Sequence, residues 1–129
     1  RGPGGPGGPD GNGGGYQGGN GIDLEPLAGL SDKSKPIIAR ILEVENYRKK
    51  YLGYVREIAE KSLDWNNTGP IVQQSRDLIM ADVKRGTRKL FSTDAFISGT
   101  ADAPIEMNLR AFFDQRRAAV LKMLDAMQN

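Results

Sequence analysis

The residues of this chain that could act on a ligand are mainly cations in two short clusters. These clusters are Arg48, Lys49 and Lys50, and then Arg85, Arg88 and Lys89. Such clusters can bind a phosphate group, a nucleic acid or an acidic protein. The simpler interpretation is solvated helix faces that pair with Glu45, Glu57 and Asp82. We favour it, because basic patches without interleaved aromatic residues are weak signals of nucleic-acid binding.

Arg116 differs from these cations, because helical spacing places it on an apolar stripe between Phe112 and Val120. A partly buried guanidinium needs a carboxylate or a carbonyl oxygen as its partner. The spacing therefore predicts either a structural ion pair or a contact with phosphate, and we favour the ion pair. Possible contacts to phosphate or to an acidic partner are thus Arg48, Lys49, Lys50, Arg88 and Arg116.

Composition excludes several kinds of catalytic chemistry. The chain has no cysteine and no histidine, so it holds no disulfide, no thiolate zinc site and no Ser–His or Cys–His pair. Asp64, Asp94 and Asp102 fall at expected helix ends, where caps and turns explain them. None of them has a metal-binding spacing. We therefore predict no catalytic residue and no metal ligand within the chain.

Charge and hydropathy narrow the range of partners. The 18 basic and 16 acidic residues give a net charge of +2, which is too even to indicate nucleic acid. No apolar run approaches the ~18–20 residues that a membrane-spanning helix needs. We expect neither a nucleic-acid partner nor a membrane span.

Glycine divides the sequence near Ile22. Twelve of the first 21 residues are glycine, and five glycines occur in the remainder. This composition predicts a disordered loop or insertion over 1–21 and a helical subdomain over 22–129. The G-x-G-x-x-G strings at 2–7 and 13–18 lack the flanking strand that a phosphate-binding loop requires. The chain opens on Arg1 rather than methionine, and we expect a piece of a longer protein.

The apolar periodicity after the glycine tract predicts an all-α fold, a small bundle of about four to five helices. Leucines and an isoleucine within 22–34 are available to attach that transition segment to the core. The first helix is expected over 35–43, with Ser34 as its cap and Pro36 in its first turn. The second is expected over 45–63, where close approach of a neighbouring helix would explain Gly53.

Three further elements follow in the sequence. Residues 64–70 (DWNNTGP) are typical of a turn, and a third helix should run from there to about Lys84, ended by Gly86. Ser92 is a suitable cap for a short helix over 93–97. The last helix is expected over 104–127, capped by residue 102 or 103. No segment alternates convincingly between polar and apolar residues, so no sheet is expected.

An ordered series of matches resembles the C-terminal part of the CotH kinase family, atypical protein kinases named after a spore coat protein. The run PIIARILEVENYRKKYLGYVREI (36–58) carries the first match, through Pro36, Arg40, Ile41, Leu42, Tyr47, Arg48, Tyr51 and Leu52. The stretch from Thr87 to Phe96 and the residues Leu109, Phe112 and Arg116 fit in order and spacing. A glycine-rich insertion before the first match also resembles the family.

The resemblance implies a diverged kinase fold that transfers phosphate from ATP, with a divalent metal such as Mg²⁺, to Ser/Thr side chains of coat or secreted proteins. It places the nucleotide- and metal-binding residues before the glycine-rich insertion. The fragment would then be an inactive helical C-terminal lobe whose partner is the missing N-terminal kinase lobe. The implied location is extracellular, at the cell surface or in a spore coat. The alternative is a free-standing helical protein-interaction module with a flexible glycine-rich tail.

Overall fold

The computed structural model describes residues 21–105 and 108–127, and the described residues are all helical or irregular, with no strand. An all-α fold is therefore confirmed. The elements are α1 (Pro36–Glu43), α2 (Glu45–Glu57), the π-helical turn η1 (Ile58–Ser62), α3 (Trp65–Arg85), α4 (Thr93–Gly99) and α5 (Leu109–Ala126). The predicted glycine-rich loop over 1–21 lies outside the described residues, except for Gly21.

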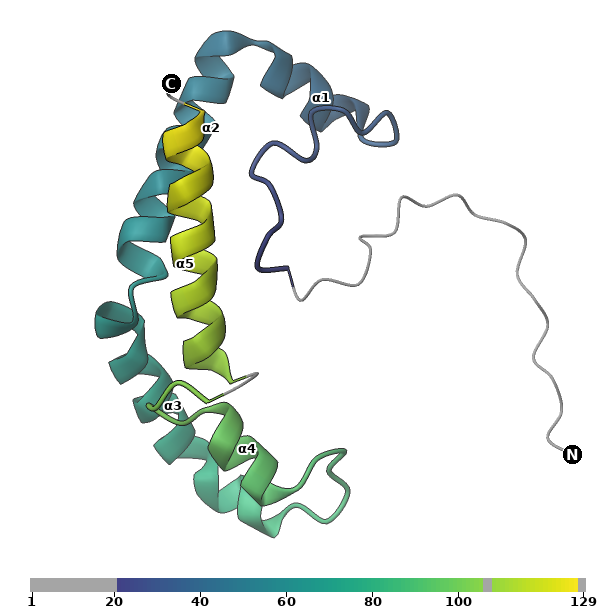
Figure 1. Ribbon diagram of the computed structural model, residues 1–129. Coiled ribbons are helices and arrows are strands. Elements are labelled where there is room, and N and C mark those ends of the chain that lie inside the picture. The colour runs from purple at the N-terminus through teal and green to yellow at the C-terminus, as the bar shows by residue number, and fades with distance from the viewer. Residues whose placement is uncertain (1–20, 106–107, 128–129) are drawn as a thin grey trace, which may run out of the picture.

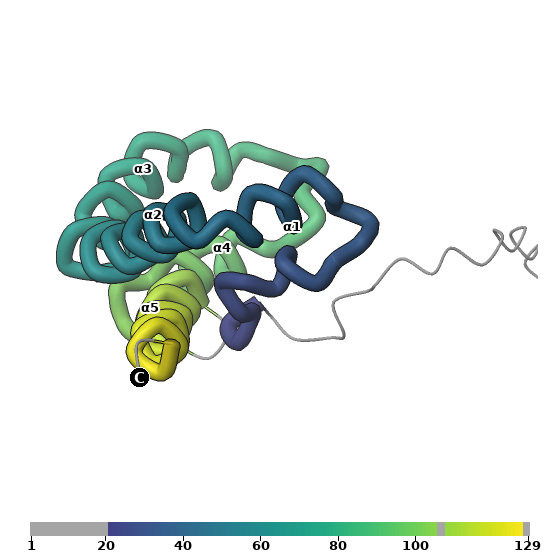
Figure 2. The backbone as a smooth tube through the Cα atoms, turned by 90° about the horizontal axis from the view of Figure 1, so that it is seen from above, coloured from purple at the N-terminus to yellow at the C-terminus, as the bar shows by residue number. Residues whose placement is uncertain are grey.

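The helices form an elongated arrangement rather than a closed bundle (Figure 1). α2, η1 and α3 follow one another along one side, and α5 runs antiparallel beside them, in contact with all three. α1 packs on α2 at one end, whereas α4 lies at the opposite end, beside the C-terminal half of α3. The view from above shows α5 on one flank of the α2–α3 run (Figure 2).

A small apolar core lies where α5 crosses α2 and η1. Ala59, Val120 and Leu124 are buried there. Four half-buried residues pack around them: Leu52, Val55, Leu63 and Leu121. Ala59 belongs to the π-helical turn, and its small side chain lets α5 approach closely. We call this contact between α2, η1, α3 and α5 the central seam.

Trp65 extends the central seam toward the far end of the molecule. Its ring meets Phe113 of α5 edge to face, with centroids 5.6 Å apart, and its Nε1 donates a hydrogen bond to Asp102 at 2.6 Å. The same ring lies over Gly69, where a Cβ atom would fall 2.6 Å from Nε1. Glycine is therefore required at position 69 by close packing rather than by backbone conformation.

The segment before α1 is attached to the helices mainly through its backbone carbonyls. Arg116 of α5 donates to the carbonyl oxygens of Ile22 and Leu24, each at 2.7 Å. The Tyr51 hydroxyl of α2 donates to the carbonyl oxygen of Pro26 at 2.9 Å, and Pro26 is buried. Apolar attachment is weaker than the sequence suggested, since Leu24 remains exposed.

Two helix starts differ from prediction. Ser34 does not cap α1, because its backbone N–H and hydroxyl both donate to Asp32 Oδ1, at 2.9 and 2.5 Å. α1 begins instead with Pro36, as expected from its missing N–H. α5 begins at Leu109 rather than 104, because Asn108 accepts from the N–H of Ala111.

The predicted turn over 64–70 is wrong, because α3 already begins at Trp65. Asp64 caps it by accepting from the Asn66 N–H at 3.0 Å. The polar side chains that suggested a loop instead donate hydrogen bonds to carbonyl groups earlier in the chain. Asn67 donates to the Lys61 carbonyl and Thr68 to the Ser62 carbonyl. They satisfy carbonyls at the end of η1 while their own backbone is helical.

The explanation predicted for Gly53 is also wrong. A Cβ atom at this position would meet no described neighbour within 4 Å. The end of α3 and the start of α4 agree with prediction: α3 stops at Arg85 before Gly86, and the Ser92 hydroxyl accepts from the Ala95 N–H. α4 continues to Gly99, two residues beyond the predicted end at residue 97.

Candidate docking surfaces

Two of the five predicted contact residues bond to the protein backbone. The Arg48 guanidinium donates to the Leu42 carbonyl at 3.1 Å and so joins α2 to α1. Arg116 makes the two carbonyl contacts described above. Its partners are carbonyl oxygens rather than the carboxylate of an ion pair, which satisfies the need of a partly buried guanidinium equally well.

The other three predicted residues are solvent-exposed. Lys49 pairs with Glu45 one helical turn earlier, at 2.6 Å, and this contact holds the pKa of Glu45 below its usual value. Lys50 and Arg88 have no hydrogen bond or ion pair within the described residues. They lie on separate elements, because Lys50 belongs to α2 and Arg88 to the loop between α3 and α4. The structure does not bring the five cations together into one site.

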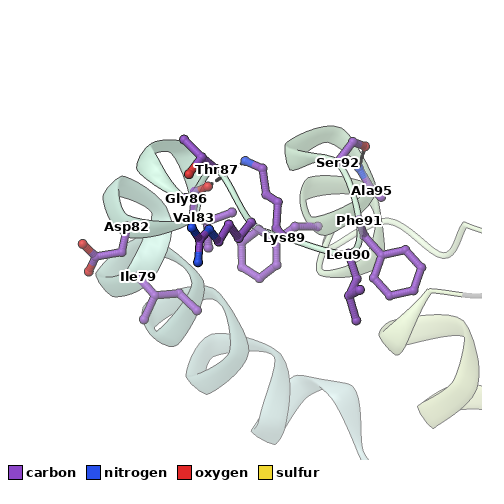
Figure 3. Close-up of a pocket in the computed structure, with 12 residues that line it drawn as sticks. Ile79, Asp82, Val83, Gly86, Thr87, Lys89, Leu90, Phe91, Ser92 and Ala95 are labelled. Carbon is purple, nitrogen blue, oxygen red and sulfur yellow. Dashed lines mark hydrogen bonds between the residues drawn. The ribbon is translucent and has the colours of Figure 1, made fainter.

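A groove lies between the end of α3, the 86–92 loop and α4, with a volume of about 920 Å³. Its apolar lining is Ile79 and Val83 of α3, Leu90 and Phe91 of the loop, and Ala95 and Phe96 of α4. Figure 3 shows Leu90 and Phe91 projecting from the loop on the α4 side of the hollow, while Ile79 lies on α3 at its other side. Leu90 is 95% exposed and Phe91 is 76% exposed. We call this hollow the α3–α4 groove.

The α3–α4 groove was not predicted, because residues 87–91 fall between two expected helices. The available signal was the apolar pair Leu90–Phe91 directly after Arg88 and Lys89. Two adjacent large apolar residues in a loop are unusual unless something covers them.

A second unburied apolar surface lies on α2. Tyr47, Tyr51, Tyr54 and Ile58 recur at helical spacing and so share one face, and all four are exposed. We call this face the tyrosine stripe. The adjoining part of the same apolar surface, through Leu52 and Val55, packs in the central seam. The hydrophobic residues of α2 thus form one wide surface, of which only part is buried.

A small polar hollow of about 360 Å³ lies beside Trp65 and Asp102. Arg110 bonds to the Asp102 carbonyl and lies 3.4 Å from its carboxylate, while Gln73 donates to the Thr100 carbonyl at 2.8 Å. These contacts position the segment between α4 and α5. Most polar groups of the hollow are thus bonded to neighbouring protein groups, which indicates a structural role, and the Arg110 Nε is the buried lining atom among the described residues that has no hydrogen-bond partner.

Neither a metal cluster nor a membrane-spanning helix is found in the described part of the chain. Among residues 21–105 and 108–127, no three acidic side chains come close enough to hold a metal ion. In the same ranges, no helix is both long and apolar enough to cross a bilayer.

Comparisons with known proteins find no similar protein. A scan against protein-family models finds no match, and searches of curated proteins and of solved structures also find none.

Proposed function

We propose that this chain is the helical C-terminal scaffold of a CotH-like atypical protein kinase. In this proposal, ATP-dependent phosphoryl transfer to Ser/Thr side chains of coat or secreted proteins is carried out by residues outside the chain. The chain itself supplies no catalytic group. Its role is to pack against a catalytic lobe and hold that lobe in shape.

The tyrosine stripe is the observation that carries the proposal. α2 has one wide apolar surface, of which one part packs against α5 and the adjoining part, from Tyr47 to Ile58, is open to solvent. An apolar surface this wide on a helix is normally buried across its whole width. Exposed contiguous apolar surface of this kind marks an interface with another protein body. α1 adds to the open surface, since Ile37 is 74% exposed and Ile41 is 50% exposed.

Three of the polar residues that carry the family resemblance have contacts that join segments of the fold. Arg48 bonds to the Leu42 carbonyl, Tyr51 to the Pro26 carbonyl and Arg116 to the Ile22 and Leu24 carbonyls. Each contact joins two segments that are distant in sequence or belong to different elements. Such contacts suit a scaffold, because they fix the positions of helices without leaving the side chain free for a substrate.

The described residues do not fit a site for ATP or Mg²⁺. Asp64 caps α3 and Asp102 accepts from Trp65, so these carboxylates are already engaged. The described residues hold no cluster of three acidic groups. We therefore derive no catalytic step through this chain, and the proposed nucleotide and metal sites would belong to the catalytic lobe.

Hydrophobic-dye binding by the 129-residue chain tests the proposal. We expect strong dye fluorescence and concentration-dependent self-association, because the tyrosine stripe lacks its cover. Replacing both Tyr54→Ser and Ile58→Ser should lower both signals, whereas Lys50→Ser on the same helix should lower neither. A chain that is monomeric, binds no dye and unfolds cooperatively would instead support the free-standing interaction module.

The coding sequence upstream of Arg1 provides a second test. The proposal expects an open reading frame that continues upstream into predicted strands, with an aspartate-bearing motif shortly before the glycine tract. An initiation codon directly before Arg1 would contradict it. Expression of the longer chain with ATP and Mg²⁺ should then give phosphoryl transfer that the 129-residue chain lacks.

A further inference from the structure

The α3–α4 groove is held open by hydrogen bonds at both ends of its loop. The Lys89 ammonium donates to the Val83 carbonyl of α3 at 2.8 Å and to the Thr93 hydroxyl of α4 at 2.6 Å. Ser92 caps α4 directly after the loop. The backbone that carries Leu90 and Phe91 is therefore positioned before any partner binds, which lowers the entropy lost on binding.

Covering the apolar residues of the groove would be energetically favourable. Leu90 is almost fully solvated, Phe91 is about three-quarters exposed, and Ile79 is also exposed. Burying a side chain of this size is favourable because apolar surface leaves water. The lining residues come from three elements and form a hollow rather than a protruding tip. A hollow of this shape suits an inserted side chain better than a flat lipid surface.

The charges around the groove are predominantly positive. Between residues 82 and 96 the sequence has four cations, Lys84, Arg85, Arg88 and Lys89, and two carboxylates, Asp82 and Asp94. Asp82 is already paired with Arg85. Among the described residues, Lys89 bonds to two neutral oxygens and Arg88 lines the groove with no partner for its side chain. The rim thus carries uncompensated positive charge.

We propose that the α3–α4 groove binds an acidic amphipathic peptide segment of a partner protein. One or two apolar side chains of the segment enter between Ile79, Leu90 and Phe96, and a carboxylate pairs with Arg88. An amphipathic helix laid in a groove is a common mode of peptide recognition. The inference goes beyond the proposed function, because it concerns the opposite end of the molecule from α1 and does not require a catalytic lobe.

Fluorescence anisotropy with a designed peptide tests the inference on the full 129-residue chain. The probe is a labelled peptide of about 15 residues with Leu and Phe at helical spacing and Glu at the other positions. The matched probe has Lys in place of every Glu. We expect saturable binding of the acidic peptide, with a Kd of about 100 μM or tighter, and at least about tenfold weaker binding of the basic one.

Variants locate the binding surface. Arg88→Glu and Leu90→Ser should each weaken binding of the acidic peptide by roughly tenfold, because one removes the charge partner and the other removes apolar contact. Both side chains are exposed and outside the core, so circular dichroism should show an unchanged fold. Lys50→Glu makes the same type of charge reversal on α2 and should leave the Kd unchanged.

Three outcomes would overturn the inference. The first is absence of saturable binding up to about 1 mM peptide. The second is equal affinity for the acidic and basic peptides, or affinity of the Arg88→Glu and Leu90→Ser variants for the acidic peptide that equals that of the unsubstituted chain. The third is occupation of the α3–α4 groove by a second copy of the chain or by a lipid surface. This would appear as Leu90-dependent self-association in sedimentation, or as Arg88-dependent binding to phosphatidylserine vesicles, without peptide binding in either case.

Discussion

Trp65 and Phe91 are aromatic residues near opposite ends of α3, and their surroundings differ completely. Trp65 is 6% exposed, packs edge to face on Phe113 and donates its only N–H to Asp102. Phe91 is solvated, beside an equally open Leu90. The difference arises because α5 reaches the first turn of α3 but not its last. The central seam supports the fold, whereas the α3–α4 groove is available for binding.

Replacing these two aromatic residues should give the largest contrast. Trp65→Ala is expected to cost about 3–5 kcal/mol of unfolding free energy, because it leaves a cavity beside Phe113 and removes the hydrogen bond to Asp102. Phe91→Ala should change it by no more than about 0.5 kcal/mol. Urea unfolding measures both changes. It is followed by far-UV circular dichroism, because Trp65 is the only tryptophan and its fluorescence is lost in Trp65→Ala. Similar losses in the two variants would remove the distinction between seam and groove.

Arg116 and Arg88 allow the same comparison between two cations, one bonded within the fold and one exposed at the α3–α4 groove. Arg116→Ala should cost about 1.5–3 kcal/mol, because two hydrogen bonds from a charged donor to the Ile22 and Leu24 carbonyls are lost. Arg88→Ala should be neutral within about 0.5 kcal/mol. Amide hydrogen exchange provides a specific readout, since only Arg116→Ala should accelerate exchange over residues 22–30. Unchanged exchange there would show that Arg116 does not hold the segment.

Two glycines extend the comparison to backbone packing. Gly69→Ala should destabilise by about 1–3 kcal/mol, because its methyl group would collide with the Trp65 ring. Gly53→Ala should stabilise by about 0.5–1 kcal/mol, because alanine is a better helix former and the site is open. Thermal unfolding of the two variants should therefore shift in opposite directions. Shifts of the same sign would contradict the assigned packing at one of the two positions.

The exposed ion pairs should have the smallest effects. Lys61 bonds to Glu57 at 2.8 Å, which lowers the pKa of Glu57 and raises that of Lys61. The lowered pKa of Glu57 implies a contribution that is present above its unfolded pKa and lost as pH falls through the folded value. The raised pKa of Lys61 implies the converse, with loss as pH rises through the folded value of the lysine.

Carboxyl NMR titration measures this effect directly. Lys61→Met should raise the midpoint of Glu57 toward its usual value and leave Glu45 unchanged. Lys49→Met should do the reverse, because Lys49 is the partner that lowers the pKa of Glu45. A Glu57 midpoint that does not respond to Lys61→Met would show that the ion pair is not populated in solution.

Local sequence signals predicted the elements of the fold with good accuracy. Pro36 at the start of α1, the Ser92 cap of α4 and the end of α3 before Gly86 all follow from backbone groups within four residues. The same local rules failed over 64–70, where Asn67 and Thr68 bond to carbonyls six residues earlier. Their side chains look like those of a loop, but they complete the end of η1.

The sequence by itself determined that the described chain is helical and that Arg116 requires an oxygen partner, because both follow from periodicity and side-chain chemistry. Only the tertiary structure decided which apolar stripes are covered. Val55 and Tyr54 are neighbours on α2, yet one packs in the central seam and the other is open. Periodicity records that a helix has an apolar face, whereas burial depends on the distant segment that reaches it. For this reason the tyrosine stripe and the α3–α4 groove became visible only in three dimensions.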